Sequence, residues 1–171
     1  MRILPVEPAH IPVLSQLAMD TFSETFAHLY PPEDLTAFLE KSYAPEKLAV
    51  EIADTAQFWR IVYEGDEAVA YLQCGPVGLP HAEADPTRMG ELKRLYVRGS
   101  QQGKGLGKML MAVALGWLDE TYGQAPQWIG VWSENHKAQA LYLSQGFEKV
   151  GEYQFPVGQT LDDEFILCRR L

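Results

Sequence analysis

The sequence has few of the features that mark secreted, metal-binding or membrane proteins. Its only two cysteines, Cys74 and Cys168, are far apart and neither belongs to a C-x-x-C pair, so neither a zinc site nor a disulfide framework is indicated. The longest uncharged apolar run, Met109 to Leu118, is half of the ~20 residues that a membrane-spanning helix needs. The opening MRILPVEPAH has neither the apolar core nor the cleavage site of a secretion signal. We expect a cytoplasmic protein with two buried thiols.

An excess of basic residues is also missing. With 14 Lys and Arg against 23 Asp and Glu, the formal net charge is -9, which argues against a nucleic-acid binder and suits a cationic partner. His81 and His136 have no metal-ligand spacing around them, so no metal is predicted. The 171 residues, 47% hydrophobic and 22% charged, are typical of one globular domain over residues 1–171, without internal repeats.

The hydrophobic pattern predicts strands that alternate with helices. The expected strands cover residues 2–7, 91–97, 127–133, 147–155 and 163–171, with a hairpin over 58–76. The expected helices follow residue 11, cover residues 31–43, begin near residue 105, and cover residues 135–146. This order predicts an α/β (α+β) fold with helices on both faces of a sheet.

A glycine-rich stretch, Gln102 to Lys108, separates the strand at residues 91–97 from the helix that begins near Gly105. The first amides of a helix have no intrahelical acceptor and lie at the positive end of the helix dipole. Glycines leave these amides accessible and permit positive φ angles. The stretch is therefore interpreted as a phosphate or pyrophosphate cradle; the alternative is a turn that only connects two elements.

The two common nucleotide motifs do not fit this stretch. A P-loop requires Ser or Thr after Gly-Lys, but Met109 follows Lys108. A Rossmann fingerprint that starts at Gly103 or at Gly105 meets Lys108 or Leu110 where its third glycine belongs.

Two blocks of sequence together resemble the GNAT superfamily of N-acetyltransferases. QGKGLG, from Gln102, fits the family's acyl-CoA pyrophosphate motif Q/R-x-x-G-x-G/A, and the segment from Val131 to Phe147 is similar to its second block, N-x-x-A-x-x-x-Y-x-x-x-G-F. The segments TFSETFAHLYPPEDL, VWSENHKA and GEYQFPVGQTLDDEFIL look most like the PaiA-type polyamine acetyltransferases. The resemblance covers essentially the whole chain.

The resemblance implies a mixed, mostly antiparallel sheet of about seven strands, with its fourth and fifth strands splayed to admit acetyl-CoA. It implies that the backbone of Leu95, Tyr96 and Val97 pairs with the pantetheine and thioester, and that Asn135 contacts the cofactor. The amides that would hold the pyrophosphate belong to Gln102, Gly103, Lys104, Gly105, Leu106, Gly107 and Lys108. A small-molecule amine acceptor and a possible homodimer are implied as well, without a nucleic-acid or membrane partner.

Amide formation from a thioester needs an uncharged amine, whereas an alkylamine with a pKa of ~10.4 is protonated at neutral pH. Direct attack by the amine also leaves a thiolate that needs a proton. Tyr142 occupies the motif tyrosine and is the candidate acid; it lies seven residues after Asn135, on the same predicted helix face as Ala138 and Gln139. As an isolated aromatic on an amphipathic helix, Tyr142 would instead be a core residue.

The candidate base is Glu91, because the histone-acetylating branch places its glutamate at the same distance before the motif glutamine. Strand alternation predicts that Glu91 projects on the side of Lys93, Leu95 and Val97. The alternatives are a carboxylate that is solvated or paired with Lys93 or Arg94, and a water chain that takes the proton.

Three aromatic residues, Phe22, Phe26 and Tyr30, lie where similar proteins border the acceptor groove, although they also fit a core. The acidic run Asp162 to Glu164 either attracts a polyamine or is simply solvated. The leading hypothesis is an acetyl-CoA-dependent N-acetyltransferase for a small, polyamine-like primary amine. The alternatives are a protein N-terminal or lysine acetyltransferase, and a non-catalytic acyl-CoA sensor.

Overall fold

The computed structural model describes all 171 residues and contains one seven-stranded sheet, in the order β1-β2-β3-β4-β5-β7-β6. Every neighbouring pair of strands is antiparallel except β4 and β5, which confirms the expected mixed sheet. The strands are β1 (Arg2–Pro5), β2 (Phe58–Glu64), β3 (Glu67–Pro76), β4 (Gly90–Val97), β5 (Gln127–Trp132), β6 (Glu148–Val157) and β7 (Thr160–Arg169).

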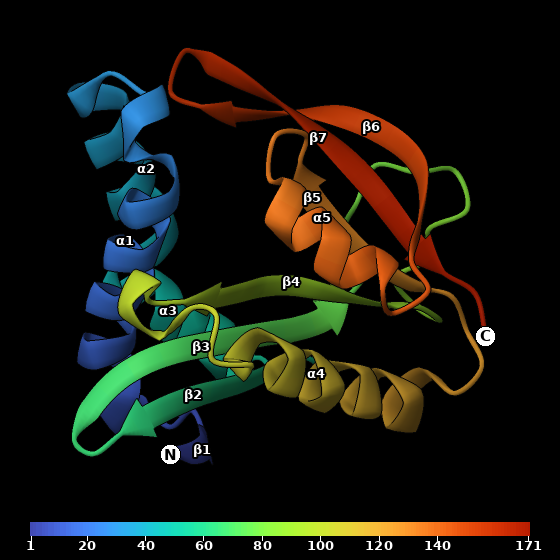
Figure 1. Ribbon diagram of the computed structural model, residues 1–171, viewed down its shortest axis with the longest axis horizontal. Helices are drawn as coiled ribbons and strands as arrows, with labels where there is room; N and C mark the ends of the chain where they lie inside the picture. The colour runs from blue at the N-terminus through green and yellow to red at the C-terminus, as the bar shows by residue number, and fades with distance from the viewer.

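Helices cover both faces of the sheet, as expected (Figure 1). One face carries α1 (Ile11–Phe26), α2 (Pro32–Tyr43) and α3 (Pro45–Ala53). The other face carries α4 (Leu106–Tyr122) and α5 (His136–Leu143). Three short 3-10 turns, Pro8–His10, Ala27–Leu29 and Gly99–Gln101, complete the chain. No element is predicted from the sequence for α3, a helix of 9 residues with one buried residue, Leu48, which is shorter than the window of about 11–18 residues in which helical periodicity is assessed.

The sheet forks between β4 and β5. These parallel strands pair only from Gly90 to Leu92, opposite Gln127 to Ile129, although β4 continues to Val97. Beyond Leu92 the edge of β4 that faces β5 has no strand partner, so no β-ladder uses the backbone groups along this edge. The expected splaying of the fourth and fifth strands is confirmed.

A bulge in β4 changes which side chains face which layer. Leu92 pairs with Cys74 and Arg94 pairs with Gln73, so Lys93 is an extra residue without a partner on β3. As a result Leu92, Leu95 and Val97 share the face of the sheet that α4 covers, while Arg94 and Tyr96 face α1–α3. The prediction that Glu91 shares a side with Leu95 and Val97 is therefore wrong, because simple alternation ignores the bulge.

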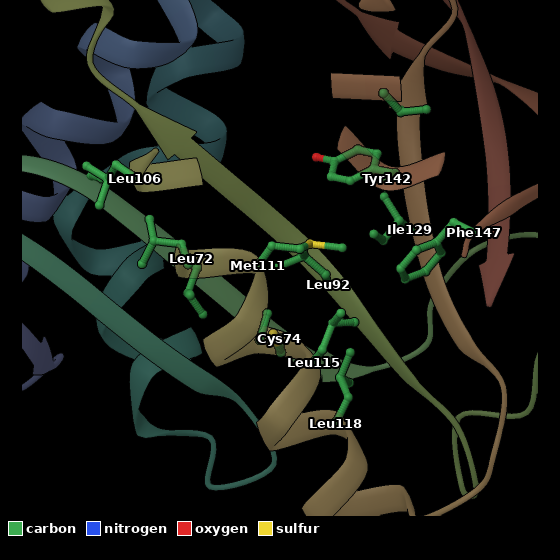
Figure 2. Close-up of a cluster of buried hydrophobic side chains, with 14 of the residues drawn as sticks. Leu72, Cys74, Leu92, Leu106, Met111, Leu115, Leu118, Ile129, Tyr142 and Phe147 are labelled. Atoms are coloured by element: carbon green, nitrogen blue, oxygen red, sulfur yellow. The ribbon is translucent and has the colours of Figure 1, made fainter. Parts of the chain in front are cut away.

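The core consists of two main clusters, one on each face. Under α4 and α5, fully buried side chains of α4 pack on Leu72, Leu92 and Ile129 (Figure 2). Each fully buried Leu or Met contributes roughly 1.5–3 kcal/mol of hydrophobic free energy, which fixes α4 firmly on the sheet. Cys74 and Cys168 are both buried and unpaired. None of the helices combines the length and the apolar character that crossing a bilayer requires.

Candidate active site

A cleft of about 1250 Å³ passes through the fork in the sheet. Its walls come from β4 and β5 in the middle, from the start of α4 and from α5 on one face, and from α1–α3, β6 and β7 on the other. The half of the cleft on the α4 and α5 face is called the cofactor half here, and the half on the α1–α3 face the acceptor half. The fork joins them.

The glycine loop forms the wall of the cofactor half. Gly103 and Gly105 have φ angles of 81° and 84°, and no atom lies within 4 Å of the position that a Cβ would take at either. None of the backbone amides from Gly103 to Lys108 donates a hydrogen bond within the protein; the first amide of this helix to do so is that of Met109, to the Gly105 carbonyl at 3.1 Å. A row of unsatisfied amides at a helix N-terminus fits a phosphate or diphosphate group.

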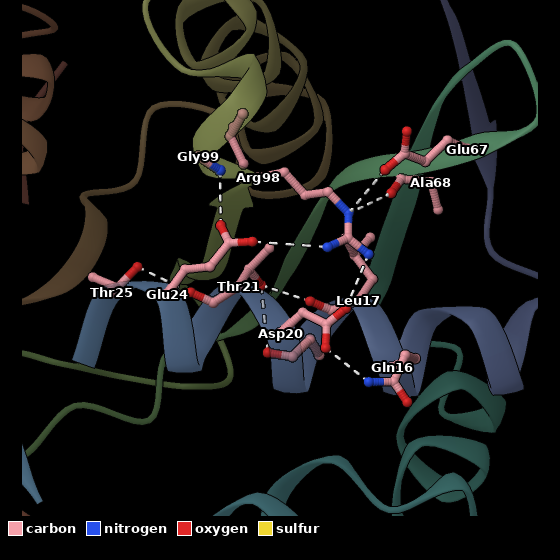
Figure 3. A network of polar contacts seen from close by, with 12 residues as sticks. Gln16, Leu17, Asp20, Thr21, Glu24, Thr25, Glu67, Ala68, Arg98 and Gly99 are labelled. Carbon is pink, nitrogen blue, oxygen red and sulfur yellow. Dashed lines mark hydrogen bonds and ion pairs between the residues drawn. The ribbon is translucent and has the colours of Figure 1, made fainter. Parts of the chain in front are cut away.

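Polar contacts hold the loop that carries these amides. Arg98 follows β4 directly and donates to Asp20 Oδ2 and to the Ala68 carbonyl, both at 3.0 Å, while the Gly99 amide donates to Glu24 at 2.7 Å (Figure 3). These contacts attach the start of the loop to α1 and β3 without using the amides from Gly103 onward.

Gln102 extends the same support toward α5. Its Nε2 donates to the Val97 carbonyl at 3.1 Å, and Lys137 Nζ donates to its Oε1 at 2.8 Å. Two residues of the predicted cradle do not line the cleft through their side chains: Leu106 is buried in the core, and the Lys104 ammonium is 2.9 Å from Gln101 Oε1.

Tyr142 lies at the fork. Its ring packs in the cluster with Phe147 under α5, and its hydroxyl is directed toward β4 (Figure 2). The residue is 8% exposed and lines the cleft, so the predicted acid role and the core role are compatible in geometry. Burial, and secondarily the charge of Glu164, raise the pKa of Tyr142 to about 12, so the phenol keeps its proton at neutral pH.

Asn135 is the N-cap of α5, and its Oδ1 accepts a hydrogen bond from the Ala138 amide at 3.1 Å. Asn135, Ala138 and Tyr142 line the cleft together, as their spacing predicts. Gln139 does not join them, because its side chain donates to the carbonyls of Trp132 and Ser133 before α5.

Glu91 is buried, at 7% exposure, and lines the cleft just below the fork. Its Oε2 accepts a hydrogen bond from the Gly78 amide at 2.8 Å and lies 3.4 Å from Lys93 Nζ. The structure thus brings Glu91 to the site, in the ion pair with Lys93 that the sequence left open.

Many aromatic residues line the acceptor half. Phe22, Phe26 and Tyr30 all line it, and the Phe26 ring meets that of Trp132 edge-on at 5.6 Å. Phe22 and Tyr30 are also buried in the core, so both interpretations of these residues hold for their positions. Five further aromatic lining residues were not predicted: Phe38, Tyr43, Trp132, Tyr153 and Phe155.

Two carboxylates of β7 also line the acceptor half. The sequence signal that could have found them is the two-residue alternation of side chains along a strand. Asp162 and Glu164 point into the cleft, whereas Asp163 between them is exposed on the other face. The Tyr30 hydroxyl donates to Asp162, and the Tyr153 hydroxyl donates to Glu164 Oε2 at 2.8 Å. Burial raises the pKa of Glu164, and Asp162 and Glu91 add to the rise, although the Tyr153 hydrogen bond opposes it.

A forked mixed sheet, free amides at a helix start beside the fork and a protonated phenol within it fit an acyltransferase that takes its acyl group from a phosphate-bearing carrier. The chain matches the acetyltransferase (GNAT) family model over residues 13–147 and belongs to this family. It is an acetyl-CoA-dependent N-acetyltransferase.

Individual relatives agree with this family. The chain is 32% identical to an uncharacterized N-acetyltransferase in the pepI 3′ region of Lactobacillus delbrueckii subsp. lactis, over 100% of this chain and 98% of that protein. The fold is similar to a PaiA N-acetyltransferase from Thermoplasma acidophilum solved with coenzyme A, with a TM-score of 0.78 at 19% identity over 100% of both chains. A ribosomal-protein-alanine N-acetyltransferase from Brucella melitensis has a TM-score of 0.68 at 21% identity, also over 100% of both chains.

Proposed function

We propose that the protein acetylates a primary amine of a small, polyamine-like cation. The observation that supports this proposal is the charge of the cleft. The acceptor half and the adjoining part of β4 carry five carboxylates, Glu51, Asp54, Glu91, Asp162 and Glu164, and two cations, Lys93 and Arg94. The charged residues that line the cofactor half are both lysines, Lys108 and Lys137. Carboxylates and aromatic faces both attract ammonium groups.

In this proposal the amides from Gly103 to Lys108 hold the diphosphate of acetyl-CoA. The Gln102 amide, which the sequence had included, already donates to the Gly99 carbonyl at 3.2 Å. The edge of β4 at Leu95, Tyr96 and Val97 receives the pantetheine, where the Val97 carbonyl already accepts a hydrogen bond from Gln102 Nε2. The side-chain amide of Asn135 contacts the cofactor near the fork. The accessible amides and the absence of side chains at Gly103 and Gly105 support this assignment. No metal is required.

Tyr142 is the proposed general acid. The attacking amine displaces the thiolate of coenzyme A, and the phenol proton neutralises this thiolate as the C–S bond breaks. Glu91 is the candidate base indicated by the sequence, acting directly or through water. Phe22, Phe26 and Tyr30 form the wall against which the carbon chain of the amine lies.

The test is release of coenzyme A from acetyl-CoA in the presence of spermidine, putrescine, single amino acids, an alanyl peptide and a lysine peptide. We expect kcat/KM for the polyamines to exceed that for the peptides by at least ~10-fold, since each polyamine adds a cation for the acidic wall. A preference for the alanyl or lysine peptide would assign the protein to protein acetylation instead. Tight acetyl-CoA binding without thiol release for any acceptor would indicate a sensor.

A further inference from the structure

One carboxylate at the fork, that of Glu164, is indicated by the sequence only as part of an acidic run that attracts a polyamine or is solvated, with no part in proton transfer. In the β5–β7 ladder Glu164 pairs with Trp132, and in the β6–β7 ladder it pairs with Tyr153. A Cβ placed on Gly130 would lie 3.4 Å from Glu164 Oε2 and 3.0 Å from the Tyr153 hydroxyl oxygen. The last residue of β5 that pairs with β4 is Ile129, so the carboxylate lies over the first residue of β5 beyond the fork.

Glu164 also faces the proposed acid through this opening. Tyr142 reaches the fork from α5 on the opposite face of the sheet, and the two side chains line the same cleft. The charge of Glu164 also contributes to the raised pKa of Tyr142. An amine held by Glu164 would therefore lie between the acid and the acceptor half.

The carboxylates of Glu164 and Glu91 differ in the protein groups that already contact them. Glu91 lies below the fork, opposite Trp128, with its Oε2 held by the Gly78 amide and paired with the Lys93 ammonium. Glu164 receives one hydrogen bond, from Tyr153 to Oε2, and no donor of the protein contacts Oε1. Both carboxylates keep Oε1 free, but only that of Glu91 is paired with a cation, so Glu164 has a fixed orientation and an unpaired charge for an ammonium group.

The geometry points to Glu164, oriented by Tyr153, as the group that binds the acceptor ammonium at the fork and removes its proton. This inference rests on the proposed function and gives the base role to Glu164 ahead of Glu91. One N–H proton passes to Oε1, and the neutral nitrogen then forms the C–N bond to the acetyl carbon while the C–S bond breaks. The Tyr142 proton goes to the thiolate, and the surplus proton on nitrogen returns to the phenolate. Glu164 finally releases its proton to water.

The surroundings of Glu164 set the expected pH dependence. The titratable groups around it are Tyr153 on β6, Asp162 on β7, Glu91 with Lys93 and Tyr96 on β4, Tyr142 on α5, and Tyr30 after α1. Burial raises the pKa of Glu164, so the active carboxylate form is lost at a higher pH than for an ordinary Glu with a pKa of ~4.3. As pH falls, kcat/KM should decline with an inflection above that value.

The decisive variant is Glu164→Gln, with Asp163→Asn as the matched control on the same strand but on the exposed face. Glu164→Gln should lower kcat/KM at neutral pH by ~100- to 10,000-fold and remove the acidic inflection, with acetyl-CoA affinity unchanged. The deficit should shrink as pH approaches the amine pKa of ~10.4, because a neutral amine needs no base. A role confined to folding would not produce this recovery. Asp163→Asn should match the wild type.

Tyr153→Phe is a second variant, which keeps the aromatic ring and removes only the hydroxyl that contacts Glu164. Loss of its hydrogen bond to the charged carboxylate should move the acidic inflection upward in pH. An unchanged inflection in Tyr153→Phe, a Glu164→Gln enzyme within ~3-fold of wild type, or loss of the inflection in Glu91→Gln alone would each overturn the assignment. All variants are assayed with the amine that the wild type prefers. A wild type that prefers the alanyl peptide would refute the proposed acceptor class and still leave this comparison valid.

Discussion

The two halves of the cleft are built in different ways. The cofactor half presents backbone amides from one continuous stretch, Gly103 to Lys108, in which glycines keep side chains out of the way. The acceptor half presents side chains from helices α1–α3 and strands β6 and β7, mostly aromatic rings and carboxylates. Backbone amides can bind a diphosphate without help from particular side chains, whereas an acceptor in the other half is selected by the side chains that line it.

This difference has an energetic side. Unsatisfied amides at a helix N-terminus are fixed by the helix itself, so binding of a diphosphate orders little of the protein. The carboxylates of the acceptor half can bind an amine only if they do not form ion pairs with nearby cations of the protein. Hydrogen bonds from Tyr30 to Asp162 and from Tyr153 to Glu164 fix these two, while Glu51 is already paired with Arg94 at 2.7 Å.

The largest expected effect lies where the two halves meet. Tyr142→Phe keeps the buried ring and removes the proton donor, so kcat should fall by ~100- to 10,000-fold while the Kd for acetyl-CoA stays the same. Because burial and Glu164 raise the pKa of Tyr142 to about 12, the acid form should persist, and its deprotonation should cause no loss of turnover below pH ~10. Steady-state kinetics and calorimetric titration with acetyl-CoA measure the two quantities.

Tyr122→Phe is the control for this variant, since Tyr122 also lies on a helix of the same face but outside the cleft. Full turnover in Tyr142→Phe would show that the phenol takes no part in the reaction. Tyr142 would then not be a group that acts on the ligands of both halves of the cleft. A parallel loss of acetyl-CoA affinity would mean that the residue belongs to the cofactor half alone.

The next effect is confined to the cofactor half. Gly105→Asp places a carboxylate where the diphosphate is expected and should raise the Kd for acetyl-CoA by ~100-fold, about the cost of one lost charge-assisted hydrogen bond of up to ~3 kcal/mol. Gly65→Asp is the matched control, because Gly65 has a φ of 60° and open space around it but lies in the β2–β3 turn. Each substitution carries a strain of ~1–2 kcal/mol, which thermal unfolding checks.

Equal acetyl-CoA affinity in Gly105→Asp and Gly65→Asp would contradict the assignment of the diphosphate to this loop. Equal destabilisation combined with a selective loss of affinity in Gly105→Asp would establish it independently of the family resemblance.

The same contrast explains what the sequence could reveal. The loop from Gln102 to Lys108 is contiguous, so its spacing alone indicated an anion site, and the fork and most elements followed from the pattern and the resemblance. Glu164 was visible only as part of an acidic run, because its partner Tyr153 and its neighbour Gly130 are brought to it by strand register. The expected side of Glu91 was wrong because of the bulge at Lys93, and nothing local in the sequence marks this bulge.

A smaller effect is expected from the charge of the acceptor half. Asp162→Asn removes one charge but keeps an oxygen that can accept the hydrogen bond from Tyr30. We expect KM for spermidine to rise ~3- to 10-fold with little change in kcat, in line with ~1 kcal/mol for a partly exposed ion pair. The effect should weaken as salt is raised.

Asp163→Asn provides the comparison for Asp162→Asn, because it removes the same charge from the exposed face of the same strand. If the two variants raise KM equally, the net charge of -9 attracts the amine from a distance, and the wall of the cleft has no special part in binding. A response to Asp162→Asn alone places the second cation of the amine beside the Tyr30 hydroxyl.

The smallest effect tests whether the cofactor half depends on backbone alone. Lys108 is exposed on the first turn of α4 and lines the cleft beside the free amides. An exposed, flexible ammonium contributes little to a solvated ion pair, about 0–1 kcal/mol, so Lys108→Gln should raise the Kd for acetyl-CoA by no more than ~5-fold. The amides cannot be removed by this substitution and should retain most of the affinity. A loss in Lys108→Gln as large as that in Gly105→Asp would mean that side-chain charge holds the diphosphate, and both halves of the cleft would then bind their ligands in the same way.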